Sequence, residues 1–190
     1  MLTGLEIRRK LVHLSSFAIP IGYALTSKRT SLIVLVSLAG IFLTLDLLRR
    51  THPGVTSLFD RFIIGTVLRE EERNRLMGST YFLLSSVLVI SLFPQAIAIV
   101  SLLILIVSDT CAAWVGKAIG RCRIFEKTLE GSLAFLVSAL LIIWLYPGVD
   151  RLSGSLAALG AAVTELLPLP LDDNFTIPFV AGVILFFVGG

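Results

Sequence analysis

One stretch of the chain is enough to indicate its fold class: residues 95–119 read QAIAIVSLLILIVSDTCAAWVGKAI. A helix needs about 20 mostly apolar residues to cross the roughly 30 Å of hydrocarbon in a bilayer, and this stretch exceeds that length. Apart from Asp109 and Lys117, it carries no charged side chain. The stretch therefore predicts a helix that crosses a membrane.

The whole chain has the composition of a membrane protein. Of its 190 residues, 56% are hydrophobic and 15% are charged, whereas roughly 25% are charged in a soluble domain. The mean hydropathy is +0.94. Cys111 and Cys122 are too few for a disulfide framework and match no zinc-ligand spacing, so we expect two free thiols.

We expect one domain over residues 1–190, and its fold class is all-α. It is a polytopic membrane helix bundle of about seven transmembrane helices plus a cytoplasmic interfacial helix. The candidate spans are 10–27, 31–48, 79–93, 95–119, 131–147, 152–167 and 174–190.

Positive charges gather on one side of this bundle. With seven spans, every Lys and Arg except Lys28, Arg29 and Arg151 falls on the side that holds the N-terminus. Such a bias marks the cytoplasmic side of a membrane protein. We therefore attribute the net charge of +3 to a cytoplasmic rim, not to nucleic-acid binding. The N-terminus and the active site are expected in the cytoplasm.

The interfacial helix is predicted in the longest loop, 49–78. Its apolar residues follow the i, i+3, i+4, i+7 spacing of one helical face: Val55, Leu58, Phe59, Phe62 and Ile63. Such a helix lies flat at the membrane surface. It either gates a lipid that enters from the side or only anchors the loop.

Asp109 is the strongest functional signal, because an acid inside a span usually faces a cavity, a partner or a metal. Residues at i+4, i+7 and i+8 share its helical face. They are Ala113 and Gly116, whose small size leaves room for a ligand, and Lys117, which can reach a phosphate. The alternative is a buried Asp–Arg pair that only holds helices together.

A basic segment follows over residues 116–132 and runs into a helix start near Thr128. The free N–H groups and the dipole at a helix start favour anions. The segment is not a Walker P-loop. The spacing of Gly116 and Gly120 also fits the small-residue face of two packed helices.

Three more groups of polar residues belong to the same rim. His13 shares a helical face with Arg9 and Lys10, and it is either a proton acceptor, a ligand or a packed hydrogen-bonding residue. Asn74 precedes a helix start and suits a ligand-facing turn. The last group contains hard oxygen ligands that suit Mg²⁺, or else forms a turn in which Asp173 or Asn174 is a helix N-cap. Its members are Glu165, Asp172, Asp173 and Asn174.

In order and spacing, these motifs resemble those of the CTP-dependent lipid kinases, which include dolichol kinase, phytol and farnesol kinases, and the yeast-type diacylglycerol kinase. The resemblance covers nearly the whole chain, at residues 6–13, 78–82, 108–121, 126–132, 165 and 172–178. The pattern is also similar to that of CDP-diacylglycerol synthases. Their further Asp-rich signature near the C-terminus is not found in this sequence, which favours a kinase.

The resemblance implies that the γ-phosphoryl group of CTP is transferred to the hydroxyl of a membrane isoprenoid alcohol, of the polyprenol/dolichol or phytol/geranylgeraniol type, with Mg²⁺ as cofactor. We expect catalysis by Asp109, Lys117, Lys127 and His13, with a carboxylate as the alternative base. The expected metal ligands are Asp109, Glu165, Asp172, Asp173 and Asn174. The expected nucleotide-binding residues are Arg9, Lys10, Asn74, Gly116, Gly120, Arg121, Thr128, Glu130, Gly131 and Ser132.

Three other functions remain open on these residues. The first is a diacylglycerol kinase that uses CTP, and the second is a CTP:phosphatidate cytidylyltransferase, which would release pyrophosphate. The third belongs to a different class, a small transporter. Transporters often carry inverted repeats and helices broken near the membrane centre, and the sequence shows no such repeat.

Overall fold

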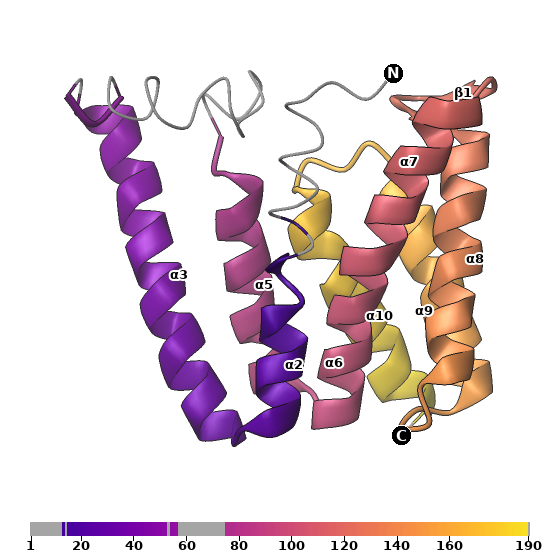
Figure 1. Ribbon diagram of the computed structural model, residues 1–190, viewed down its shortest axis with the longest axis horizontal. Coiled ribbons are helices and arrows are strands. Elements are labelled where there is room, and N and C mark those ends of the chain that lie inside the picture. The colour runs from indigo at the N-terminus through magenta and orange to yellow at the C-terminus, as the bar shows by residue number, and fades with distance from the viewer. Residues whose placement is uncertain (1–12, 14, 53, 57–74, 190) are drawn as a thin grey trace.

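The computed structural model describes residue 13 and residues 15–52, 54–56 and 75–189. Within them the chain is nearly all helical, and the helices stand side by side as upright rods (Figure 1). Their order is α2 (Ala18–Leu25), α3 (Lys28–Thr51), α5 (Gly78–Leu92), α6 (Gln95–Leu103), the π-helical turn η2 (Ile104–Ser108), α7 (Asp109–Ile119), the short strands β1 (Arg123–Ile124) and β2 (Lys127–Thr128), α8 (Leu129–Leu145), α9 (Arg151–Leu166) and α10 (Asp173–Gly189).

The all-α prediction is confirmed for the described residues. Each candidate span contains a helix, although the first is described only in part and its helix covers Ala18–Leu25. Two helical stretches, Lys28–Thr51 and Gln95–Ile119, are long and apolar enough to cross a membrane, and three further apolar helices are shorter. The figure of seven transmembrane helices therefore stays a prediction. The expected interfacial helix lies mostly outside the described residues.

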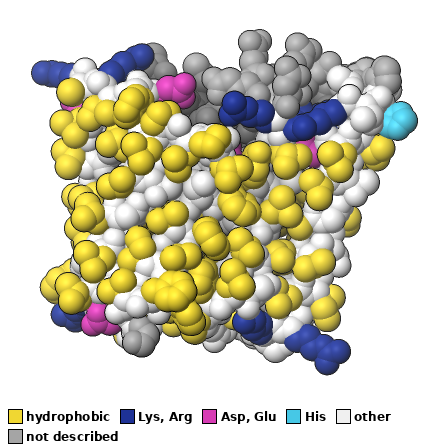
Figure 2. Space-filling model, turned by 180° about the vertical axis from the view of Figure 1, so that it is seen from behind, with side chains coloured by type: hydrophobic (Ala, Val, Ile, Leu, Met, Phe, Trp, Pro, Cys, Tyr) yellow, Lys and Arg dark blue, Asp and Glu magenta, His cyan; other side chains and the backbone are white. Residues whose placement is uncertain are grey.

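The surface of the bundle is that of a membrane protein. Large apolar side chains face outward, and Leu25, Leu145 and Phe187 are 78–81% exposed. Figure 2 shows a broad apolar band between two layers of charged side chains. Water would disfavour such a contiguous apolar surface, whereas lipid accommodates it. Lys28, Arg29 and Arg151 lie at one end, and the other described Lys and Arg residues lie at the opposite end.

Local sequence explains where several helices begin. The side chains of Ser27, Thr128 and Asp150 accept hydrogen bonds from backbone N–H groups in the first turns of α3, α8 and α9, at 3.1, 3.2 and 2.9 Å. These contacts satisfy N–H groups that have no partner within the helix. Inside the bundle, α9 contributes alanines with no exposed surface, among them Ala157 and Ala161. Small residues let neighbouring helices approach closely.

Two local features differ from the sequence-based prediction. The span 95–119 was expected as a regular α-helix. Its α-helical hydrogen bonding is interrupted by the π-helical turn η2 immediately before Asp109. The loop before α8 was not expected to form strands, yet β1 and β2 pair as a hairpin, with Arg123 opposite Thr128. Cys111 and Cys122 are both free thiols, as predicted.

Candidate active site

A lysine held between two carboxylates forms the centre of the site. Lys127, on β2, donates from Nζ to Glu165 Oε1 at 2.9 Å and to Asp173 Oδ2 at 2.7 Å. The hydroxyl of Ser132, in the first turns of α8, donates to the other oxygen of Glu165 at 3.0 Å. The hairpin, the start of α8, the end of α9 and the start of α10 therefore meet at this cluster.

Electrostatics keeps Lys127 charged. Burial lowers the pKa of Lys127, but the negative charges of Asp173 and Glu165 and their hydrogen bonds outweigh burial and raise it above the ordinary value. Glu165 is only 3% exposed, and a buried carboxylate needs a paired cation and further hydrogen bonds. Lys127 and Ser132 supply both. The site therefore contains a charged lysine beside two acids.

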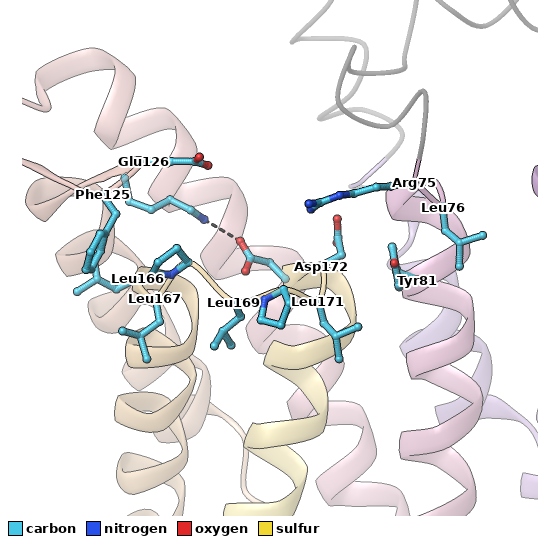
Figure 3. Close-up of a pocket in the computed structure, with 14 residues that line it drawn as sticks. Arg75, Leu76, Tyr81, Phe125, Glu126, Leu166, Leu167, Leu169, Leu171 and Asp172 are labelled. Carbon is cyan, nitrogen blue, oxygen red and sulfur yellow. Dashed lines mark hydrogen bonds and ion pairs between the residues drawn. The ribbon is translucent and has the colours of Figure 1, made fainter.

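A cavity of about 150 Å³ opens beside this cluster (Figure 3). One part of its lining is polar and includes Lys127, Glu126 and Asp173. The other part is apolar and comes from the connection between α9 and α10, where leucines and prolines alternate. Ligand pockets for whole small molecules usually measure roughly 300 Å³ or more. The described cavity is therefore suited to a phosphate group and the polar end of a lipid.

Asp109 lies near the cluster at the first residue of α7. Its Oδ2 is 3.7 Å from Nε2 of His13, and its charge acts on Asp173. The π-helical turn directly before Asp109 is of a kind found frequently at functional sites. The structure thus brings His13, Asp109, Asp173, Lys127 and Glu165 to the same end of the bundle.

Gly116, Gly120 and Gly131 surround Thr128 where α7 packs against α8. A Cβ added to Gly116 would lie 2.7 Å from Thr128 Oγ1, and one added to Gly131 would lie 2.9 Å from both that atom and the carbonyl of Ala112. These glycines therefore allow close contact between the helices. This agrees with the alternative that Gly116 and Gly120 belong to the small-residue face of two packed helices. Their role in nucleotide binding stays a prediction.

Glu130 organises the loop before α8. Its Oε1 accepts hydrogen bonds from the backbone N–H groups of Arg121 and Cys122, at 3.0 and 3.2 Å. The turn of the hairpin contains Phe125 at a φ of 54°, a conformation that is rare for a bulky residue. Together these contacts hold the loop so that Lys127 lies between the acids. Whether Glu130 and Arg121 bind the nucleotide stays a prediction.

Asp172 caps the start of helix α10. Its Oδ1 accepts from the backbone N–H of Asn174 at 2.9 Å and from the Asn174 side-chain amide at 2.7 Å. The segment therefore forms a capped turn, as the alternative interpretation expected. The capping residue differs from the expected Asp173 or Asn174, because the helix begins at Asp173 and the preceding Asp172 occupies the N-cap position.

Among the described residues, no group of three or more His, Cys, Asp or Glu side chains is placed to hold a metal ion. The chemistry of the site nevertheless fits Mg²⁺, which proteins often bind through one or two carboxylates together with substrate phosphates. Glu165 and Asp173 converge on one cation, the Lys127 ammonium. They are the described residues best arranged to hold Mg²⁺, and Asp109 is the third candidate.

Other expected site residues are not brought into the cavity. Lys117 and Arg121 are exposed near the end of α7 and do not line the described cavity. Arg9, Lys10 and Asn74 lie outside the described residues.

Sequence reasoning missed Arg75, which lines the cavity, and the buried pair Asp46 and Arg49 behind it. The available signal was Asp46, an acid within the candidate span 31–48 that is followed by an arginine one turn later. A buried Asp–Arg pair, the arrangement considered as the alternative for Asp109, occurs at Asp46.

These features define a membrane helix bundle with a charged, phosphate-sized site at one end. Two relatives named as CTP-dependent diacylglycerol kinases identify its family, and a third relative is uncharacterized. A CTP-dependent diacylglycerol kinase 1 of Schizosaccharomyces pombe is 30% identical over 75% of this chain and 74% of that protein. The protein of the same name from Saccharomyces cerevisiae is 28% identical over 97% of this chain and 73% of its own. An uncharacterized protein of Rickettsia prowazekii is 32% identical over 91% of this chain and 89% of its own.

The chain belongs to the CTP-dependent lipid kinase family. This confirms the resemblance at the level of the family. No family model matches the chain, and no solved structure is significantly similar to it.

Proposed function

We propose that this protein is a CTP-dependent diacylglycerol kinase, which transfers the γ-phosphoryl group of CTP to the free hydroxyl of diacylglycerol at the cytoplasmic face of the membrane. The observation that carries this proposal is the site itself: a charged lysine–carboxylate cluster shares one cavity with an apolar wall. A kinase that joins a nucleotide phosphate to a membrane lipid needs both surfaces in contact.

The relatives' names support diacylglycerol as the acceptor and CTP as the donor. The isoprenoid alcohol expected from the sequence is the second candidate, because it presents the same hydroxyl on an apolar tail. Leu167, Leu169 and Leu171 are 40–49% exposed along the connection between α9 and α10. They offer apolar contacts to the tail of either lipid.

The reaction we propose is a single displacement. The lipid hydroxyl oxygen forms a bond to the γ-phosphorus, the bond from that phosphorus to the β,γ-bridging oxygen breaks, and CDP leaves with the electron pair. The hydroxyl proton passes to His13 or to a carboxylate, and Asp109 lies beside that histidine. Lys127 offsets negative charge on the transferred group. Phosphoryl transfer depends mainly on positioning and electrostatic stabilisation. A base and a cation of these types are therefore suited to the reaction.

Mg²⁺ would be held by Glu165 and Asp173, with Asp109 as the further candidate. When bound, it would neutralise phosphate charge. In the structure Lys127 provides positive charge to the same carboxylates. We propose that these two acids would accept either cation, and that Lys127 would contact the phosphates.

The test is a transfer assay with purified protein in detergent and Mg²⁺. CTP, ATP, GTP and UTP, each labelled at the γ-phosphate, are offered with diacylglycerol, a polyprenol, phytol, geranylgeraniol or phosphatidate. We expect label from CTP in phosphatidate when diacylglycerol is present. Transfer to a prenol instead would overturn the acceptor and keep the kinase.

Two further outcomes of this assay would overturn the kinase. Label released as pyrophosphate in the presence of phosphatidate would indicate a cytidylyltransferase, and no turnover with any pair would favour a transporter. Asp109→Asn is the inactive control. We expect it to remain folded and to lose activity by about a hundredfold or more, a typical loss for an electrostatic contact to the transition state.

A further inference from the structure

We infer that Arg75 is a phosphate-binding residue of the cavity and that the buried pair Asp46–Arg49 is what positions it. The identity of the phosphate as part of CTP rests on the proposed function. The positioning itself rests on contacts between α3 and the start of α5. None of the catalytic groups discussed above takes part in these contacts.

Asp46 caps α5 from the neighbouring helix. Its side chain has no exposed surface, and its Oδ2 accepts hydrogen bonds from the backbone N–H of Met77 at 2.7 Å and from the hydroxyl of Thr80 at 2.8 Å. Met77 occupies the N-cap position of α5 and has no side-chain oxygen to offer. An acid from α3 therefore accepts from the N–H of the N-cap residue, as the N3 glutamate of a capping box does within its own helix.

Arg49 extends this network to residue 75. Its Nη2 donates to Asp46 Oδ1 at 2.7 Å and to the backbone carbonyl of Arg75 at 3.0 Å. The backbone entering α5 is thus held at residues 75 and 77 by one ion pair. Arg49 is 3% exposed, and a buried ion pair is often no more stabilising than apolar residues of similar size. A gain in stability therefore does not by itself explain why this pair is present. Accurate placement of Arg75 does explain it.

Arg75 is the residue so placed. Its side chain is exposed and lines the cavity. Figure 3 shows its guanidinium group extending into the cavity near Asp172, and Lys127 lines the same cavity. Two cations therefore face the cavity from two different elements. Arginine binds phosphate through paired hydrogen bonds, so Arg75 and Lys127 are arranged to hold a phosphate group between them.

The first experiment measures kinetics and CTP binding for Arg75→Ala, with Arg50→Ala as the matched control. Arg50 is the exposed neighbour of Arg49 on the same helix. We expect Arg75→Ala to raise KM for CTP by about tenfold or more, since a hydrogen bond to a charged group is lost. Arg75→Lys should give a KM for CTP between those of Arg75→Ala and the wild type. KM for the lipid should not change. Wild-type values for Arg75→Ala would overturn the inference.

The second experiment tests positioning with a double-mutant cycle. Asp46→Asn should also raise KM for CTP, but in the Arg75→Ala background it should add less than about twofold, because both changes remove the same contact. Thr80→Val is the milder replacement if Asp46→Asn does not fold. Full additivity of the two effects on KM for CTP would show that Asp46 acts independently of Arg75 and would overturn its positioning role.

A binding measurement separates this inference from the proposed function. Tm of the detergent-solubilised wild-type protein is compared with and without CTP or pyrophosphate, both with Mg²⁺. A rise in Tm that Arg75→Ala abolishes would support the inference even if no lipid were phosphorylated. A wild-type protein whose Tm responds to neither anion would overturn it, whatever the transfer assay showed.

Discussion

At the scale of single residues, Lys127 has two tasks that conflict. It neutralises Glu165 and Asp173 in the described structure, and the proposed reaction needs its charge on a phosphate. A cation that compensates buried acids cannot be removed without leaving those acids unpaired. Loss of activity in a Lys127 variant would therefore be ambiguous by itself.

A paired substitution measures the contribution of Lys127 to stability separately. Lys127→Met should lower the free energy of unfolding by about 3 kcal/mol, because Glu165 would be left buried and charged. Adding Glu165→Gln should restore part of this stability, since the second charge is removed. Neither variant should transfer phosphate, because both lack the cation.

The measurement is Tm together with transfer from labelled CTP. Lys28→Met is the matched control, since Lys28 lies at the opposite end of the bundle and donates to the carbonyl of Ser91. If the double variant were stable and fully active, Lys127 would have no role in the reaction.

At the scale of elements, the contact between α7 and α8 depends on glycine. At Gly120 an added Cβ would overlap the backbone carbonyl of Gly116 and meet both branches of Thr128, at 2.8 and 2.9 Å. Backbone atoms cannot move aside as a flexible side chain can. The end of α7 would therefore have to distort, and Thr128 on the hairpin that carries Lys127 would have to move away.

We expect Gly120→Ala to lower the free energy of unfolding by about 1–3 kcal/mol, the usual range for overpacking. Gly40→Ala is the matched control, because nothing lies within 4 Å of a Cβ added to Gly40 on α3. That control should be as stable as the wild type or slightly more stable, since alanine favours helix. Unfolding followed by circular dichroism measures both. Equal Tm for the two variants would contradict the proposed close packing.

At the scale of the whole molecule, the orientation of the bundle stays a prediction that the cysteines can test. Cys122 is exposed in the loop after α7, at the same end as the candidate active site, and Cys111 is partly buried. A thiol reagent that cannot cross membranes should therefore modify Cys122 in inside-out vesicles and not in intact cells, if this end is cytoplasmic.

Cys122→Ser identifies the labelled residue, and Cys111→Ser should leave the labelling unchanged. Modification of Cys122 from outside intact cells would place the candidate active site on the other face. The CTP reaction at the cytoplasmic face would then be excluded, because the nucleotide could not reach the site.

The sequence alone determined the helices, their approximate bounds and the gathering of charge at the bundle ends. These properties are local: each apolar run satisfies its own backbone hydrogen bonds, and each charged residue avoids hydrocarbon. It also pointed to Asp109, Lys127, Glu165 and Asp173, because charged groups beside apolar segments stand out in the chain. The π-helical turn before Asp109 left no such signal, since it changes the hydrogen bonding of an otherwise uniform apolar run.

Only the tertiary structure decided which of these residues meet. Lys127 and Asp173 are 46 positions apart, and Asp46 lies 34 positions before Thr80. Those contacts depend on which helices pack together and at what height, and small side chains and glycines control that packing. For the same reason Arg75 could not be recognised in the sequence, because its place at the cavity depends on a buried ion pair from another helix.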